Sequence, residues 1–161
     1  MNPDKNLNKA IILRFSVIAS IIFLLDMLTK YLVLTFSPYH LGITPYLSFI
    51  KVYNYGASFS LGSSFTHYAN YFLLAVSVLV IIVIVIQVIK QKSFALHQTN
   101  SLGLIVGGAL GNSIDRIRFG AVFDFISVHY NSWYYPTFNL ADSAITIGAI
   151  LYIWNSLTSH K

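Results

Sequence analysis

The chain has 161 residues, of which 56% are hydrophobic and 9% are charged. Soluble domains carry roughly 25% charged residues, so this composition excludes an ordinary soluble protein and predicts a single membrane domain over residues 1–161. The net charge of +5 does not indicate a nucleic-acid surface, because half of the basic residues fall in the N-terminal segment and one short loop, as topology signals do. The absence of Cys excludes disulfides, thiolate catalysis, cysteine-bound metals and a lipidated cysteine.

Four hydrophobic segments predict four transmembrane helices, because a helix needs about 20 residues to cross a bilayer. The helices are expected at about 11–35, 68–89, 101–119 and 138–157. The first segment is too long for a signal-peptide core and no small-residue cleavage site follows it, so we expect an uncleaved signal anchor. Within it, Asp26 precedes Lys30 by four residues, which is the spacing of a stabilising helical pair. We expect Asp26 to be a structural partner of Lys30 and Thr29.

The segments at about 36–67 and 120–137 are predicted to lie outside the cytoplasm. The first is rich in Ser, Gly, Pro and aromatic residues and has no acidic residue. Its residues Tyr46–Tyr53 are β-branched or aromatic and weakly alternating, which favours a strand, and Asn54–Gly56 supply turn chemistry. The predicted fold is therefore all-α, with four transmembrane helices and a small extracytoplasmic β-sheet platform.

The third helix has a face of small residues, because Gly103, Gly107 and Gly111 are spaced by four. Such a face lets another helix approach closely, and its continuation reaches Asp115, with Asn112 three residues before it. Gly120 is expected to end the helix. The following residues, AVFDFISV, indicate a short extended or re-entrant piece that carries Asp124.

Residues 127–137 form the second exposed link, whose Trp and Tyr side chains are typical of a bilayer interface. The fourth helix is expected to begin near Phe138 and to carry Asn139, Asp142 and Thr146 on one face. Asp142 lies in the first turn of this helix, where the helix dipole favours an anion.

The basic residues predict the orientation of the four helices. One side of the path collects Lys5, Lys9, Arg14, Lys90, Lys92 and Lys161, and the other collects Lys30, Lys51, Arg116 and Arg118. This excess places both termini in the cytoplasm. At about 1.5 Å per residue, Asp26, Asp115 and Asp142 lie roughly 18 to 21 Å from the cytoplasmic helix ends, and Asp124 lies near the same level. We therefore expect these carboxylates to gather in the outer leaflet.

An ionisable residue inside a membrane is a functional-site hypothesis by default. In the sequence, Asp115 has Arg116 or Arg118 as a possible partner, whereas Asp124 and Asp142 have no basic neighbour within five residues. Two carboxylates brought close in a low-dielectric site cannot easily both ionise, so one holds a proton. Such a pair can activate water and protonate a leaving amine, which is peptide hydrolysis without a covalent intermediate.

Other hydrolytic mechanisms have less support. The five His residues show no i,i+4 pairing and no HExxH motif, so we expect no metal site. Lys51 with Ser58 or Ser60 would be needed for a Ser and Lys mechanism, but no spacing recommends them.

Five blocks, in this order along the chain, resemble the lipoprotein signal peptidases, the bacterial signal peptidase II family of four-helix membrane aspartyl proteases. The blocks are DMLTK at 26–30, NYGASF at 54–59, GGALGNSIDR at 107–116, VFDF at 122–125 and FNLAD at 138–142. Together they span nearly the whole chain. The sequence departs from the family pattern at Ser58, where Ala is common, and this puts only the fine fit of the substrate in doubt.

The resemblance implies that Asp124 and Asp142 are the catalytic dyad of an endopeptidase. It further implies that Asn54, Gly56, Asn112, Arg116 and Asn139 support the site or contact substrate, and that Asp26, Lys30 and Asp115 are structural. The implied substrates are diacylglyceryl-modified prolipoproteins, cut before the lipidated cysteine at the bacterial inner membrane. The resemblance also implies inhibition by globomycin, contact with membrane lipid, no cofactor or metal and no obligate protein partner.

Two functions of other classes remain open from the residues alone. Intramembrane Asp and Asn beside glycine-lined helices also mark the ion paths of a small transporter or proton-coupled channel. The glycine spacing could equally serve a helix-bundle interaction protein with merely paired acids. A conduit should carry polar residues through the whole bilayer, but the second helix and the cytoplasmic halves of the third and fourth are apolar, which favours a one-sided active site.

Overall fold

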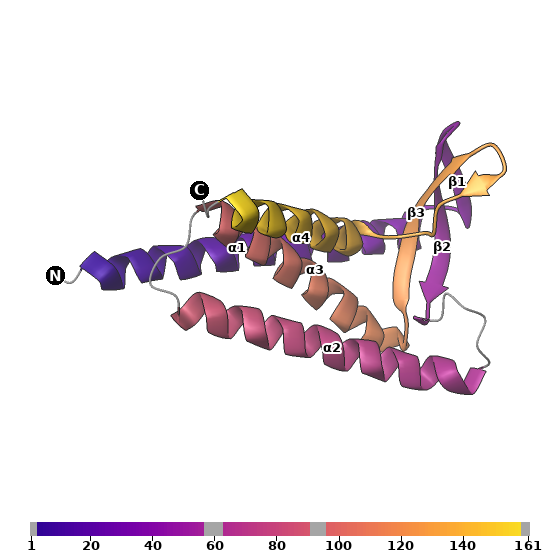
Figure 1. Cartoon of the computed structure of the whole chain (residues 1–161). Coiled ribbons are helices and arrows are strands. Elements are labelled where there is room, and N and C mark those ends of the chain that lie inside the picture. The colour runs from indigo at the N-terminus through magenta and orange to yellow at the C-terminus, as the bar shows by residue number, and fades with distance from the viewer. Residues whose placement is uncertain (1–2, 57–62, 91–95, 159–161) are drawn as a thin grey trace.

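The computed structural model describes residues 3–56, 63–90 and 96–158. Its helices are α1 (Pro3–Phe36), α2 (Ser63–Lys90), α3 (Leu96–Phe119) and α4 (Leu140–Thr158). Its strands are β1 (His40–Thr44), β2 (Leu47–Asn54), β3 (Val122–Tyr130) and β4 (Trp133–Tyr134). The helices form a bundle with the strands gathered at one end, and the N-terminal end of α1 and the C-terminal end of α4 lie at the other (Figure 1).

Three helices begin earlier than their apolar segments predict. The helical backbone starts at Pro3, Ser63 and Leu96, because polar residues continue a helix beyond the part that hydropathy marks. Helix α4 instead begins later than expected, at Leu140, because Asn139 acts as its N-terminal cap.

Helix α3 is packed between α1 and α4 by its glycines. A Cβ atom at Gly107 would lie 2.6 Å from the backbone oxygen of Ala19 in α1. A Cβ atom at Gly108 would lie 2.5 Å from the backbone oxygen of Ala141 in α4. The predicted close-packing face is therefore confirmed, and it serves contacts within the chain.

An apolar core joins the helices at the end of the bundle away from the sheet. Its buried side chains come from α1, α2 and α3, and they are Ile11, Phe15, Ala19, Ile84, Val88, Leu102 and Val106. A second cluster, formed by Val33, Phe123 and Phe125, joins the end of α1 to β3. The sheet is thereby anchored to the bundle by aromatic packing.

Within the described part of the chain, three helical stretches are long and apolar enough to cross a membrane. They are Asn8–Phe36, Tyr68–Lys90 and Leu140–Thr158. Helix α3 is more polar, and its buried residues include Thr99, Ser101, Asn112, Ser113 and Asp115. Because α3 packs against the other helices, its side chains do not need to be as apolar as those of a helix that faces lipid.

The strands form one antiparallel sheet in the order β1-β2-β3-β4. The strand predicted at Tyr46–Tyr53 is confirmed as β2, and the extended piece predicted around Asp124 is the nine-residue strand β3. The two exposed links are thus joined, because β2 and β3 pair directly. In this register Val52 faces Asp124, and the pairing shifts between Phe49 and Val52, as in a β-bulge.

Candidate active site

Asp124 is placed by β3 among three other elements. Its carboxyl group is buried, at 1% exposure. Asn54 lies diagonally across the β2–β3 ladder, within reach of that group, and its Nδ2 donates to Asp124 Oδ2 at 3.0 Å. The Nδ2 of Asn139 donates to Asp124 Oδ1 at 2.7 Å. Both oxygens of Asp124 therefore accept hydrogen bonds from neutral amides.

The pKa of Asp124 is raised to about 7. Burial is the largest cause, because it penalises the charged form, and the negative charge of Asp142 adds to it. The amide donors of Asn54 and Asn139 offset part of this effect, because they stabilise the ionised carboxylate. Asp124 can consequently hold or release a proton near neutral pH.

Asp142 sits in the first turn of α4 and shares a reciprocal cap with Asn139. The backbone N–H of Asp142 donates to Asn139 Oδ1 at 2.9 Å, and the backbone N–H of Asn139 donates to Asp142 Oδ2 at 3.2 Å. This pattern is a capping box with Asn and Asp in place of the common residues. The second oxygen, Asp142 Oδ1, accepts the Nδ2 of Asn112 at 2.7 Å.

Asn139 is the bridge between the two acids. A backbone bridge between Ile126 and Phe138 holds the start of α4 against β3, which brings Asn139 beside Asp124. Because the Oδ1 of Asn139 accepts the N–H of Asp142, its Nδ2 must face the other way, toward Asp124. Asn139 therefore binds the Asp124 carboxylate with its side chain and the Asp142 carboxylate with its backbone N–H, which places the two acids relative to each other.

Gly56 acts on the site through Asn54. The N–H of Gly56 donates to Asn54 Oδ1 at 2.9 Å, which leaves the Nδ2 of Asn54 to face Asp124. Gly56 has a φ of 80°, a conformation that residues with a side chain rarely adopt. The rest of this block, including Ser58, lies outside the described residues. Ser60, which follows the block, lies outside them too.

Lys51 is engaged away from the acids, because its Nζ donates to the carbonyl oxygen of Leu34 near the end of α1 at 2.8 Å. A lysine at a helix C-terminus also complements the helix dipole. Lys51 therefore already has a structural role at the end of α1.

The other two intramembrane acids form an ion cluster with Lys30. The Nζ of Lys30 lies 2.7 Å from Asp26 Oδ2 and 2.7 Å from Asp115 Oδ2. All three side chains are buried. The expected pair of Asp26 and Lys30 is present, whereas the hydroxyl of Thr29 donates to backbone oxygens of Leu25 and Asp26 rather than to the carboxylate.

The expectation that Asp115 pairs with Arg116 or Arg118 is wrong. Asp115 continues the glycine face toward α1 and meets Lys30 there, whereas side chains one residue apart on a helix point in different directions. Arg118 instead lies over the ring of Phe119, 5.1 Å from its centroid. Arg116 is half-buried and lies within the electrostatic influence of Asp142, Asp124 and Asp115.

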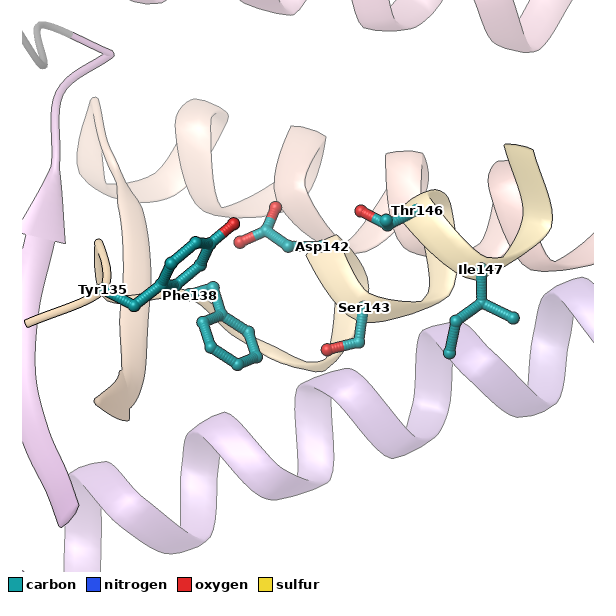
Figure 2. A pocket seen from close by; sticks show the side chains of 6 residues that line it. All are labelled: Tyr135, Phe138, Asp142, Ser143, Thr146 and Ile147. Atoms are coloured by element: carbon teal, nitrogen blue, oxygen red, sulfur yellow. The ribbon is translucent and has the colours of Figure 1, made fainter. Parts of the chain in front are cut away.

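A cavity of about 320 Å³ opens beside Asp142. Its lining residues are Tyr135, Phe138, Asp142, Ser143, Thr146 and Ile147. Figure 2 shows the Tyr135 ring and the Asp142 carboxylate at one end of this space, with Thr146 and Ile147 further along α4. Asp124 is absent from the wall, so the two acids differ in access. Tyr135 and Ser143 were not anticipated, although both adjoin the FNLAD block.

In the parts of the chain that the structure describes, no three His, Asp or Glu side chains are grouped so that they could hold a metal ion. The described His129 instead contacts Ser48 at 3.1 Å and stacks on Tyr134. The polar groups that gather at the candidate site are the two carboxylates and their amide partners.

Comparison with known proteins places the chain in a family. A family model described as signal peptidase (SPase) II matches residues 18–158. The lipoprotein signal peptidase of Polynucleobacter necessarius subsp. necessarius (strain STIR1) is 39% identical over 150 residues, which cover 91% of this chain and 90% of that protein. The lipoprotein signal peptidase of Janthinobacterium sp. (strain Marseille) is 40% identical over 143 residues, covering 87% and 86%.

A solved structure of a bacterial membrane enzyme has a similar fold. It matches with a TM-score of 0.77 at 31% identity, covering 90% of this chain and 88% of that chain. The family match covers residues 18–158 and therefore includes every residue of the carboxylate site. The chain therefore belongs to the signal peptidase II family of membrane aspartyl proteases.

Proposed function

We propose that this enzyme removes the signal peptide from diacylglyceryl-modified prolipoproteins by cutting before the lipidated cysteine, with Asp124 and Asp142 as its catalytic dyad. The observation that carries the proposal is the bridge by Asn139, which binds both carboxylates at once. Neither acid has a cation within salt-bridge distance among the described residues. Both therefore keep the capacity to exchange protons.

The two acids take different roles in this mechanism. Asp142 lines the cavity and lies at a helix N-terminus, where a negative charge is favoured, so it acts as the base. Asp124 is buried and its pKa is raised to about 7, so it holds the proton at rest. A carboxylate base beside a neutral carboxylic acid is the arrangement that peptide hydrolysis without a covalent intermediate requires.

The chemical steps follow from these roles. Asp142 takes a proton from water as the water oxygen bonds to the carbonyl carbon of the scissile peptide. Asp124 then gives its proton to the leaving nitrogen as the C–N bond breaks, which yields a free carboxyl group and a free amine. The half-buried Arg116 lies where its positive charge can offset the negative charge that develops on the substrate oxygen.

The neutral amides support the dyad. Asn54, Asn112 and Asn139 hold the four carboxylate oxygens in place, and Gly56 sets the orientation of Asn54. Preorganised donors of this kind need no rearrangement during the reaction.

The arrangement in the membrane is part of the proposal. Residues 1–161 form one domain that crosses the inner membrane four times, with α3 as the fourth spanning helix. Its 24 residues would extend for about 36 Å, which is enough to cross the hydrocarbon core. Both termini are in the cytoplasm, and the sheet, with the segments at 36–67 and 120–137, lies outside. The N-terminal end of α1 and the C-terminal end of α4 lie together at the end of the bundle opposite the sheet, which supports this topology (Figure 1).

The dyad then lies near the outer leaflet, where a lipidated substrate would present its scissile bond. We propose that residues 36–66 form a platform that grips the extended substrate and that residues 127–137 form a mobile flap. Tyr135 belongs to the second segment and lines the cavity beside Asp142, which supports a covering role for it.

The test is cleavage of a synthetic diacylglyceryl prolipoprotein by the purified chain in detergent micelles. We expect Asp124→Asn and Asp142→Asn each to lower kcat by about a thousandfold or more, as loss of an essential acid or base does. Asp4→Asn is the matched control, because Asp4 lies in the first turn of α1 at the opposite end from the sheet. Full activity of either dyad variant would refute the assignment.

A further inference from the structure

Lys30 has a buried ammonium group that contacts three side-chain oxygens. Its side chain is 4% exposed, and its Nζ lies 2.7 Å from Asp26 Oδ2 and 2.7 Å from Asp115 Oδ2. The third contact is a hydrogen bond of 3.2 Å to Asn112 Oδ1. An ammonium group has three N–H donors, which equals the number of oxygens that Lys30 contacts here. Two of these contacts are ion pairs, and the third joins Lys30 to Asn112, which in turn binds the carboxylate of Asp142.

The two acids of the ion cluster bind the backbone beside the two acids of the dyad. Asp26 Oδ1 accepts the N–H of Ala141, the residue before Asp142, at 2.9 Å. Asp115 Oδ2 accepts the N–H of Phe123, the residue before Asp124, at 3.1 Å. Lys30 therefore joins, through its two ion pairs, the backbone segments that present both dyad carboxylates.

The third contact of Lys30 determines which end of the Asn112 amide faces Asp142. Lys30 and Asn139 both donate to Asn112 Oδ1, at 3.2 and 3.0 Å. The amide can satisfy both only with its Nδ2 turned toward Asp142 Oδ1, which lies at 2.7 Å. The reversed amide would set an oxygen against the carboxylate and an N–H₂ group against the ammonium, which is repulsive at both ends.

We propose that Lys30 is a positioning residue for the cleavage reaction, beyond its expected structural role. It keeps the N–H₂ group of Asn112 directed at Asp142, and it aligns the two backbone segments that carry the dyad. Loss of the Asn112 donor would leave the Asp142 carboxylate with a single donor, the N–H of Asn139. The carboxylate could then turn about that one hydrogen bond within the cavity. The inference rests on the proposed dyad and concerns how that dyad is held.

The simplest variant, Lys30→Met, removes the only cation of the ion cluster, so it leaves two buried acids unpaired and is expected to fold poorly. Lys30→Met combined with Asp115→Asn removes one charge of each sign. An Asn at 115 still offers an oxygen to the N–H of Phe123. This double variant keeps the net charge of the cluster as it is in the unaltered chain, and Asp115→Asn alone shows what the loss of that acid contributes.

The experiment measures kcat and KM for lipoprotein cleavage on folded protein, after size-exclusion chromatography and thermal unfolding confirm that each variant is folded. Relative to Asp115→Asn, the double variant should lower kcat by about tenfold or more with KM within about twofold, since Lys30 touches no substrate. Asn112→Ala is then added to both the double variant and Asp115→Asn, and the kcat values of these two proteins are compared. There, loss of Lys30 should have little further effect on kcat, because the amide through which it acts is gone.

Equal kcat values for the double variant and Asp115→Asn would overturn the positioning role. The positioning role would also be overturned if the fold-decreases in kcat from Lys30→Met and Asn112→Ala multiplied in the combined variant. That result would show that the two residues act independently. These outcomes differ from failure of the proposed function. If the unaltered chain cleaves no lipidated substrate, the function fails. If the unaltered chain cleaves the substrate and Asp142→Asn does not, the proposed function stands. If Lys30→Met then has no effect on kcat, only the positioning role fails.

Discussion

The protein has two groups of acids in this bundle, and they differ in the side chains that bind them. Asp26 and Asp115 share the ammonium of Lys30, whereas Asp124 and Asp142 are held by the amides of asparagines. An ion pair supplies an opposite charge to a buried carboxylate, which offsets part of the cost of burying it. An amide holds a carboxylate in position without supplying a charge, so the acid can still exchange protons. The same residue type thus serves the fold in one group and chemistry in the other.

After loss of a dyad carboxylate itself, the largest effect should come from breaking the amide bridge within the dyad. We expect Asn139→Ala to lower kcat by about a hundredfold or more, because Asp124 loses a donor and α4 loses the cap that holds the backbone N–H of Asp142. Asn139→Ser separates these causes, because Ser keeps a capping oxygen but is too short to reach Asp124. Its kcat should fall similarly while its thermal stability falls less. Near-normal kcat in Asn139→Ser would show that the bridge to Asp124 is dispensable.

The pH profile should show that Asp124 titrates in the working range. Burial and the charge of Asp142 raise the pKa of Asp124 to about 7, so this group carries its proton below that pH and loses it above. Because the proton is needed for the leaving nitrogen, kcat/KM should fall by about tenfold per pH unit on the alkaline side. Reassay at pH 6.5 after incubation at pH 9 controls for unfolding. A flat profile from pH 6 to 9 would contradict the assignment of Asp124 as the acid.

Breaking the ion cluster should affect the fold more than the chemistry. Asp26→Ala leaves the contacts of Lys30 with Asp115 and Asn112 available, but it removes one buried ionic partner and the acceptor of the Ala141 N–H. Loss of one member of a buried pair destabilises a protein by about 3 to 5 kcal/mol. The yield of folded protein should therefore fall more than turnover per folded molecule. The reverse order would reject a structural role for Asp26.

The smallest effect should come from adding a side chain at Gly111 of α3, which lies against the ion cluster. The position that a Cβ atom would take at Gly111 is occupied by the Asp26 carboxylate. Gly111→Ala should lower the free energy of unfolding by about 1 to 3 kcal/mol, as overpacking does. Gly42→Ala is the matched control, because a Cβ atom there would meet nothing within 4 Å. Equal melting temperatures in both variants would show that the cluster can shift without cost.

The local patterns of the sequence predicted much of the fold. Apolar segments of sufficient length predicted α1, α2 and α4 as membrane helices, and alternation predicted β2. The spacing of Gly103, Gly107 and Gly111 predicted the face of α3 that another helix approaches, but not that α1 covers it. Pairing between β2 and β3 was not predicted, because it joins two links that are separated by two helices.

The candidate site divides in the same way. Asp124, Asp142 and their asparagines were identified from short blocks, because each block carries its polar residue in an apolar setting where charge is costly. The sequence neighbours of Asp115 indicated an arginine partner, but the helix turns Asp115 toward α1 and thus toward Lys30. Charge pairing across helices depends on which faces meet, and neighbours in sequence do not reveal it.

The sequence by itself determined that the chain is a membrane protein and which residues carry its costly charges, because transfer into lipid depends on the composition of each segment. Only the tertiary structure decided how these charges are grouped. It placed Lys30 between Asp26 and Asp115, and Asn139 between Asp124 and Asp142. The physical reason is that hydrogen bonds and ion pairs act over about 3 Å, so they depend on the packing of helices and strands that lie far apart in the chain.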